Sequence, residues 1–251
     1  MRLVDLLRLT FSSLGSHRMR SSLTALGIGV GIAAVILLTS IGEGIHQFVI
    51  AEFTQFGTNI IGVTPGKAVT RGASIGIFGS DRPLSLDDAA ALKRTPYAVY
   101  VVPALQGNAE VSAAGRSRRT TVYGVGPDFP AAFKIPVAAG RFLPHDDPNN
   151  ARAFVALGAK VRSELFGAEN PLGGRLEIGG NRYRIIGIMA AKGQVLGIDL
   201  DDSVYIPAGR ALELFNREGL MEIDVVHSAS APLDKVVEGI RRILTARHGR
   251  E

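Results

Sequence analysis

Residues 21–42 read SSLTALGIGVGIAAVILLTSIG and contain no charged side chain. A helix needs about 20 apolar residues to cross the hydrocarbon core of a bilayer. This stretch therefore predicts one transmembrane helix. It is also the main source of the positive mean hydropathy of the chain, +0.20, which is unusual for a protein without a membrane segment.

The basic residues are concentrated directly before this stretch. Residues 1–20 hold four arginines against one aspartate, a net charge of +3 within the +5 of all 251 residues. Positive charge beside an apolar span places that side in the cytoplasm. A nucleic-acid-binding protein would instead carry its basic stripe on the folded domain, so we expect no nucleic-acid partner.

The apolar run is longer than the core of a signal peptide, and no A-x-A-like cleavage site follows it. We therefore expect a retained, single-pass anchor with the N-terminus cytoplasmic and the C-terminal domain on the other side of the membrane. Leu3, Leu7, Phe11 and Leu14 recur at helical spacing, which predicts a cytoplasmic amphipathic segment over 1–20. A short flexible tail is the alternative for this segment.

Small residues in the span indicate helix packing inside the bilayer. Gly27 and Gly31 form a G-x-x-x-G pattern, and Ala25, Gly29 and Ala33 continue the small-residue face. Small side chains let helix backbones approach closely in lipid. The alternative is that glycine and alanine are simply common in spanning helices.

The helical period continues past the span over residues 43–56. A helix from 22 to 56 would be roughly 50 Å long, against a bilayer core of about 30 Å. We therefore expect a stalk helix in the outer compartment, and its apolar side needs a partner. The residues predicted to pack along this stalk are Ile45, Phe48, Val49, Phe53 and Phe56.

Residues 57–251 predict an α+β domain, because hairpins cluster in the middle and helices do not regularly follow strands. The hairpin-rich middle, about 107–200, is interpreted as an insertion into a mixed α/β part formed by both flanks. The predicted strands are 59–63, 97–102, 108–113, 119–125, 154–157, 175–178, 182–188, 203–206 and 222–226. Strands 108–113 and 119–125 are predicted to form a hairpin around residues 114–116, and strands 175–178 and 182–188 another around residues 179–181. The predicted helices are 85–94, opened by a Ser85 capping box, 159–166, stopped by Gly167, and a last helix capped by Ser230.

Patterns that carry chemistry are weak in this sequence. Residues 72–76 match G-x-S-x-G around Ser74, but the strand and helix that this motif requires do not flank it, so a glycine-rich loop is favoured over a hydrolase. The acidic groups at 145–147 and 199–202 are interpreted as solvated turns. The sequence contains no cysteine and no Walker phosphate loop, which excludes a thiolate site and Walker-type ATP binding.

A series of short motifs covers nearly the whole chain in a characteristic order. They are RSSLTALGI at 20–28, SIGEG at 40–44, GTNIIGVTPG at 57–66, GRF at 140–142, VALG at 155–158, LFG at 165–167, NPLG at 170–173, YRIIGI at 183–188, DDSVYIP at 201–207 and RHG at 247–249. Together they resemble the N-terminal transmembrane helix and periplasmic core domain of the MacB-type ABC transporter permease family.

This resemblance implies a noncatalytic permease that transmits ATP-driven movement to the periplasm, for export or lipoprotein release, with no cofactor. It implies a cytoplasmic ABC ATPase as a separate subunit, a second permease chain in a homo- or hetero-dimer, and a periplasmic adaptor as a further partner. It also implies a porter-like part at about 57–106 and 201–251 beside the insertion.

Members of that family continue into an FtsX-like membrane domain with three further spans, which this 251-residue sequence lacks. The expectation is therefore a fragment, a split permease or a degenerate copy. The alternative function is a single-pass, membrane-anchored periplasmic binding or sensor protein. A hydrolase using Ser74 is the third hypothesis.

Overall fold

The computed structural model describes residues 18–56, 59–66, 83–195 and 198–249. The chain divides into two compact units, Met1–Glu52 and Phe53–Glu251, and each is described by itself. The predicted amphipathic segment before residue 18 lies outside the described residues, as do Ser74 and the predicted glycine-rich loop around it.

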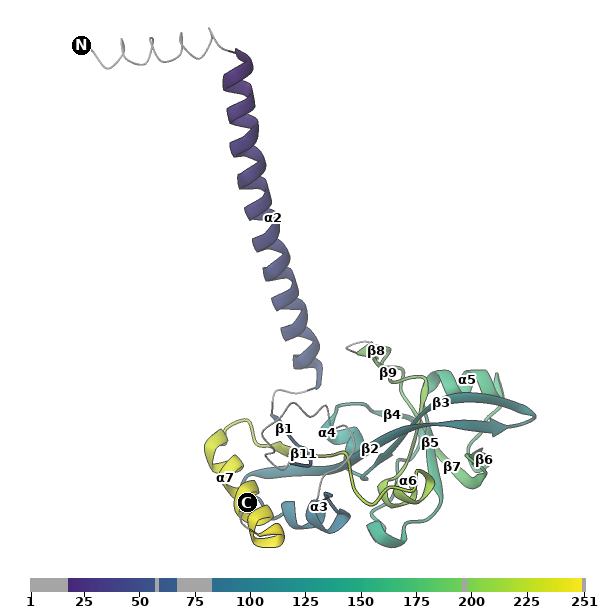
Figure 1. Cartoon of the computed structure of the whole chain (residues 1–251). Coiled ribbons are helices and arrows are strands. Elements are labelled where there is room, and N and C mark those ends of the chain that lie inside the picture. Colours follow the sequence, from purple (N-terminus) through teal and green to yellow (C-terminus); the bar gives the residue numbers. More distant parts are fainter. Residues whose placement is uncertain (1–17, 57–58, 67–82, 196–197, 250–251) are drawn as a thin grey trace. The chain divides into compact units, whose positions relative to one another are not determined.

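Helix α2 runs from Arg18 to Phe56 without interruption (Figure 1). Its 39 residues correspond to a length of about 58 Å. The part from Arg18 to Phe48 is long and apolar enough to cross a membrane. The hydroxyls of Thr24 and Thr39 donate to backbone carbonyls three or four residues earlier, which satisfies these polar groups within the helix itself. The prediction of one helix continuing beyond the apolar run is confirmed.

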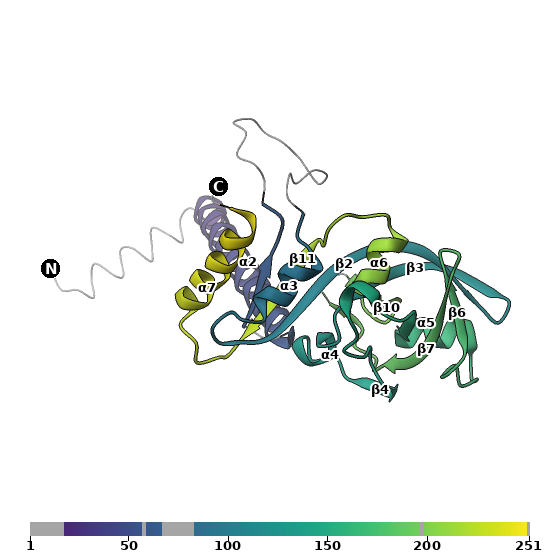
Figure 2. The same cartoon turned by 90° about the horizontal axis from the view of Figure 1, so that it is seen from below.

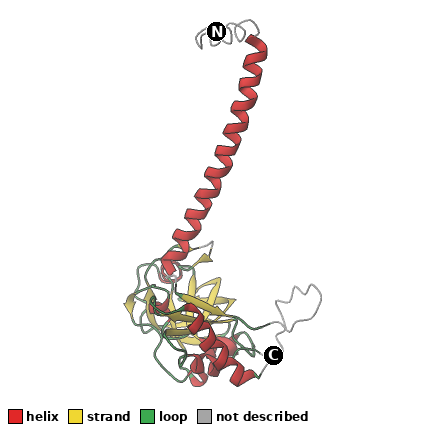
Figure 3. Cartoon of the chain, turned by 90° about the vertical axis from the view of Figure 1, so that its left-hand side faces the viewer, coloured by secondary structure: helices red, strands yellow, loops and turns green. Residues whose placement is uncertain are grey.

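The second unit contains one large mixed sheet (Figures 1 and 3). Neighbouring strands pair in the order β1, β11, β2, β3, β10, β5, β7, β4, and the remaining strand, β6, pairs with both β2 and β7. Only the β3–β10 and β5–β7 pairs among these described strands are parallel. The strands span β1 Ile60–Val63, β2 Ala98–Ala113, β3 Arg116–Val125, β4 Val137–Gly140, β5 Phe154–Leu157, β6 Arg175–Ile178, β7 Asn181–Met189, β10 Ser203–Pro207 and β11 Glu222–His227.

The double pairing of β6 closes part of this sheet into a ring. Its six strands follow one another as β2, β3, β10, β5, β7 and β6, and β6 then returns to β2 through Val111 and Ser112. The other half of β2, from Ala98 to Ala104, pairs with β11, and β1 lies outside β11. Strand β2 therefore belongs both to the ring and to the open part of the sheet, and Figure 2 shows it running the length of this unit.

The prediction of two strands, at 97–102 and 108–113, was wrong in one respect, because β2 is a single strand of 16 residues. Pro103 and Gly107 suggest a break, yet Pro103 is paired with Ile223, and Gly107 faces the ring of Phe215. A Cβ added at Gly107 would lie 2.5 Å from a carbon of that ring, so the glycine makes room for the aromatic side chain. The strand also crosses the proposed boundary near residue 107, and the division into two parts stays a prediction.

Two tight turns set the hairpins of the ring. Ala114 and Gly115 join β2 to β3 with φ angles of 52° and 75°, and Gly179 and Gly180 join β6 to β7 with 53° and 83°. Two successive residues with positive φ are typical of type I′ turns, whose twist matches that of the flanking strands. Both predicted hairpins are confirmed.

Helices pack on both faces of the sheet. Residues of the helices at 86–92, 159–166, 208–214 and 233–248 join the larger of two hydrophobic clusters, and residues of the helix at 129–132 join the smaller one. The last helix begins after Pro232 rather than after a capping Ser230, because Pro232 occupies the N-cap position and the Ser230 hydroxyl lies beside that of Ser228. The smaller elements at 129–132, 137–140 and 208–214 were not predicted. The helices are α3 Leu86–Leu92, α4 Phe129–Ala132, α5 Ala159–Phe166, α6 Ala208–Leu214 and α7 Leu233–His248, with a 3₁₀ turn at Pro148–Asn150 and a small hairpin of β8 Gln194–Val195 and β9 Ile198–Asp199.

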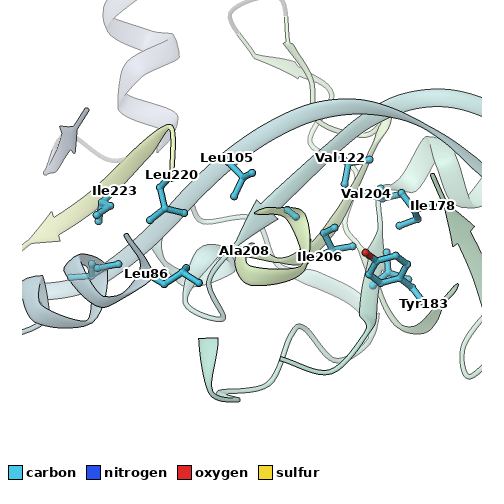
Figure 4. Packing of buried hydrophobic residues seen from close by; sticks show 14 of the residues in the cluster. Leu86, Leu105, Val122, Ile178, Tyr183, Val204, Ile206, Ala208, Leu220 and Ile223 are labelled. Carbon is cyan, nitrogen blue, oxygen red and sulfur yellow. The ribbon is translucent and has the colours of Figure 1, made fainter. Parts of the chain in front are cut away.

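Strand β10 is buried at all five positions and separates two hydrophobic clusters. Val204 and Ile206 point into the larger cluster, which Figure 4 shows together with Leu86, Leu105 and other residues from α3, β2 and the ring. Tyr205 points the opposite way, into the smaller cluster beside α4. Because side chains alternate along a strand, β10 contributes buried side chains to the clusters on both faces of the sheet.

Candidate functional site

The small residues of the apolar helix form two stripes instead of the single predicted face. Positions two residues apart on an α-helix differ by about 200°, so Gly27 and Gly31 lie nearly opposite Ala25, Gly29 and Ala33. No atom lies within 4 Å of a Cβ added at Gly27, Gly29 or Gly31. Helix α2 therefore carries two narrow strips at which another helix backbone could approach closely, and their use in packing stays a prediction.

The predicted stalk residues all fall within α2. Ile45 and Phe48 are about 60% exposed, so their apolar side chains are uncovered in the isolated chain. The side chains of Val49, Phe53 and Phe56 lie outside the described part of the structure. Only three residues separate Phe56 from strand β1. The apolar helix is thus joined by a very short segment to the edge of the sheet.

Next to β1 lies a buried carboxyl group that the sequence analysis did not identify. Asp224 is 8% exposed and sits in β11 between its Cα partners Gly62 of β1 and Val102 of β2. Its backbone is paired within the sheet, but its carboxyl group forms no side-chain hydrogen bond with another described residue. Burial, followed by the neighbouring charge of Glu222, raises the pKa of Asp224 to about 7. This carboxyl therefore exchanges a proton near neutral pH.

A second buried carboxyl joins α3 to the end of α7. Asp88 is 2% exposed at its side chain, and its oxygens accept hydrogen bonds from the backbone N–H and hydroxyl of Ser85, which completes the predicted capping box. Arg247 Nε donates to the same carboxylate, and His248 Nε2 lies 3.0 Å from it. Burial acts to raise the pKa of Asp88, but these contacts, led by that with Arg247, lower it to about 2. Asp88 is therefore ionised and fixes the last turn of α7 against α3.

The two acidic groups singled out in the sequence hold turns. Asp146 binds Arg152 through two N–O contacts of 2.8 and 2.9 Å. Lys160 lies 3.0 Å from Asp199 and 3.4 Å from Asp202. Within the described ranges, no three His, Asp or Glu side chains are arranged to hold a metal ion.

The sequence model that describes the MacB-like periplasmic core domain matches residues 21–243, which include the apolar helix and most of the second unit. The chain belongs to this family. The match covers residues of both units, and the resemblance expected from the sequence motifs is confirmed.

Full-length relatives of known name agree with this assignment. The chain is 32% identical over 249 residues to the pyoverdine export ATP-binding/permease protein PvdT of Pseudomonas entomophila, covering 98% of this chain and 37% of the relative. It is 30% identical over 252 residues to the macrolide export ATP-binding/permease protein MacB of Vibrio parahaemolyticus, covering 99% of this chain and 38% of the relative. The chain thus spans less than two fifths of the length of these relatives.

Solved structures place the fold in the same group. The periplasmic region of MacB from Actinobacillus actinomycetemcomitans matches with a TM-score of 0.63 at 22% identity, over 78% of this chain and 87% of that one. The extracellular domain of the noncanonical ABC-type transporter YknZ from Gram-positive bacteria matches with a TM-score of 0.57 at 19% identity, over 67% and 86%. The predicted combination of an N-terminal apolar helix and a mixed α/β domain is confirmed.

Replacing Asp88 by asparagine should destabilise the domain by about 2 kcal/mol, the size that corresponds to the lowering of its pKa by its contacts with Arg247 and Ser85. Denaturant unfolding of the full chain in detergent measures this loss. Because the pKa of Asp88 is about 2 in the folded state and near 4 when unfolded, its contribution should be full above pH 4 and disappear as the pH falls towards 2. Replacing exposed Asp234 on α7 by asparagine is the control, and equal losses would contradict the assignment.

Asp224 should make stability fall as the pH rises. Its folded pKa of about 7 exceeds the unfolded value near 4, so the folded state holds a proton that the unfolded state has lost. The free energy of unfolding should therefore decrease between pH 4 and pH 7, and a shift of this size corresponds to a total on the order of 4 kcal/mol. Asp224→Asn should remove that part of the pH profile, and a wild-type profile in the variant would refute the assignment.

Proposed function

We propose that this chain is the membrane-anchored, extracytoplasmic part of an ABC-type export permease and that it transmits ATP-driven movement without itself hydrolysing ATP. The observation that carries the proposal is the family match, which runs as one stretch through the apolar helix and the folded unit. The printed names of the relatives describe export by ATP-binding/permease proteins. We assign ATP hydrolysis to a separate cytoplasmic ABC subunit.

The folded unit has a direct route for such movement. A displacement of α2 reaches β1 through three connecting residues, and β1 is paired along its whole length with β11. Strand β11 is paired in turn with the first half of β2. The ion pair between Arg247 of α7 and Asp88 of α3 couples the end of α7 to α3, which packs on the same sheet. Beyond the three connecting residues, the links from β1 to β11 and from β11 to β2 are backbone pairing, and the link from α7 to α3 is the ion pair of Arg247 with the buried Asp88.

The proposed arrangement is a single pass through a bacterial inner membrane, with the basic N-terminus in the cytoplasm and the folded unit in the periplasm. A second permease chain, identical or different, packs against α2 in this arrangement. A periplasmic adaptor is a further proposed partner. The proposal covers export or lipoprotein release and does not choose between these cargoes.

Affinity purification from native membranes in a mild detergent tests the main proposal. A tag on the full chain should retain an ABC ATPase and a second membrane chain in stoichiometric amounts. A chain without a permease role, such as a single-pass sensor, would purify as a monomer without either partner, and that result would contradict the proposal. An unrelated single-pass protein of the same membrane, tagged in the same way, controls for nonspecific retention.

The two small-residue stripes give separate predictions for the second membrane chain. Replacing Gly27 and Gly31 together by isoleucine should reduce partner cross-linking severalfold if that stripe is the contact, because the added side chains keep the helix backbones apart. The matched double replacement of Ala25 and Gly29 tests the other stripe. Measurement is by cross-linking in membranes at equal expression. Unchanged cross-linking in both double variants would refute a role for either stripe.

A further inference from the structure

An apolar pocket lies where five segments of the second unit meet. Its walls come from α3, the first half of β2, the end of β3, the loop 143–151, and the start of α6. Leu86 and Ala208 are two of its wall residues, and both appear in Figure 4. Leu86, Val101 and Ala208 are each less than 10% exposed. The pocket is thus an extension of the hydrophobic core that reaches the surface.

Prolines make up a large part of the walls of this pocket. A proline fixes its own φ angle, so a wall rich in prolines changes little when a ligand enters. The start of α6 also presses against the loop, because a Cβ added at Gly209 would lie 2.2 Å from the carbonyl oxygen of Pro148. The five wall prolines are Pro103, Pro127, Pro144, Pro148 and Pro207.

The volume of about 70 Å³ limits what can enter. Pockets that enclose a drug-sized molecule are about 300–1,000 Å³, and a cavity of about 150 Å³ accepts benzene. This pocket is therefore too small for an aryl ring and has room for one short alkyl group. The rest of such a ligand must lie outside, against the rim.

The rim carries one charge that is not neutralised. Lys93 and Asp146 are the charged residues among those that line the pocket. The carboxylate of Asp146 is already bound at both oxygens by Arg152. Lys93 is exposed and has no ion-pair partner among the described residues. A ligand with an anionic group next to its apolar end therefore matches both the walls and the rim.

We propose that this pocket is a binding site for small organic anions, with the apolar end between the proline walls and the acidic group at the ammonium of Lys93. Binding at this pocket requires no second chain, because all of its walls come from residues of this chain. Failure of the chain to retain an ATPase would leave it unaffected.

The absence of cysteine from the sequence permits a clean test. A single cysteine at Asn149, exposed in the loop beside the pocket, carries a trifluoromethyl label on the full chain in lipid nanodiscs. The same label at exposed Ala131 of α4, which does not line the pocket, is the control. Titration with hexanoate should shift the ¹⁹F signal at position 149 to saturation and leave that at position 131 unchanged.

Variants then test separately the apolar pocket and the ammonium group of Lys93. Lys93→Gln should weaken hexanoate roughly 2- to 5-fold and leave neutral hexan-1-ol unaffected, whereas Lys235→Gln on α7 should change neither. Ala90→Trp, at an exposed rim position, should block both ligands. Equal shifts at the two labels, no saturation, or hexanoate binding that is the same with and without Lys93 would each overturn the proposal.

Discussion

The backbone pairing of β2 is the interaction on which the rest of the folded unit depends. Its first half holds β11, and through β11 the strand β1 that follows the apolar helix. Its second half meets β6 and so closes the ring. From Ala104 to Ala113, β2 also pairs with β3. Without β2, the backbone groups of β3, β6 and β11 that pair with it would lose their hydrogen-bond partners, and neither the ring nor the open part of the sheet could form.

Local signals predicted most of the individual elements. The capping box at Ser85, the turns at 114–115 and 179–180, and the glycine that ends α5 each act within a few residues, and the structure has them where expected. The error at β2 has a different origin. Proline and glycine are poor strand residues on average, but the pairing partners of β2 and the ring of Phe215 over Gly107 override that preference. The sequence does not show that a side chain 108 residues away requires this glycine.

Of the candidate functional features, only the apolar helix could be predicted, because it depends on the local composition of the sequence. The apolar run and its small residues were evident in the sequence, although helix geometry divides those residues into two stripes. The ion pair between Asp88 and Arg247 joins residues 159 positions apart. The sequence therefore indicated the helix cap at Ser85 and Asp88, but not the contact of Asp88 with Arg247. Nothing in the local sequence distinguishes Asp224, whose pKa depends on the strands beside it. The proline pocket likewise exists only because five segments converge.

The continuity of β2 also has a mechanical consequence. An extended strand cannot lengthen, because its rise of about 3.4 Å per residue is already near the limit of the chain, so sixteen residues form an element with a contour of roughly 54 Å. Its pairing with β11 and then β3 continues without a shift from Tyr100 to Ala113. A pull or rotation applied at the end near Ala98 must therefore arrive at the Ala114–Gly115 turn as a translation or a twist. Strand β2 thus connects the two ends of the domain by a segment that cannot be stretched.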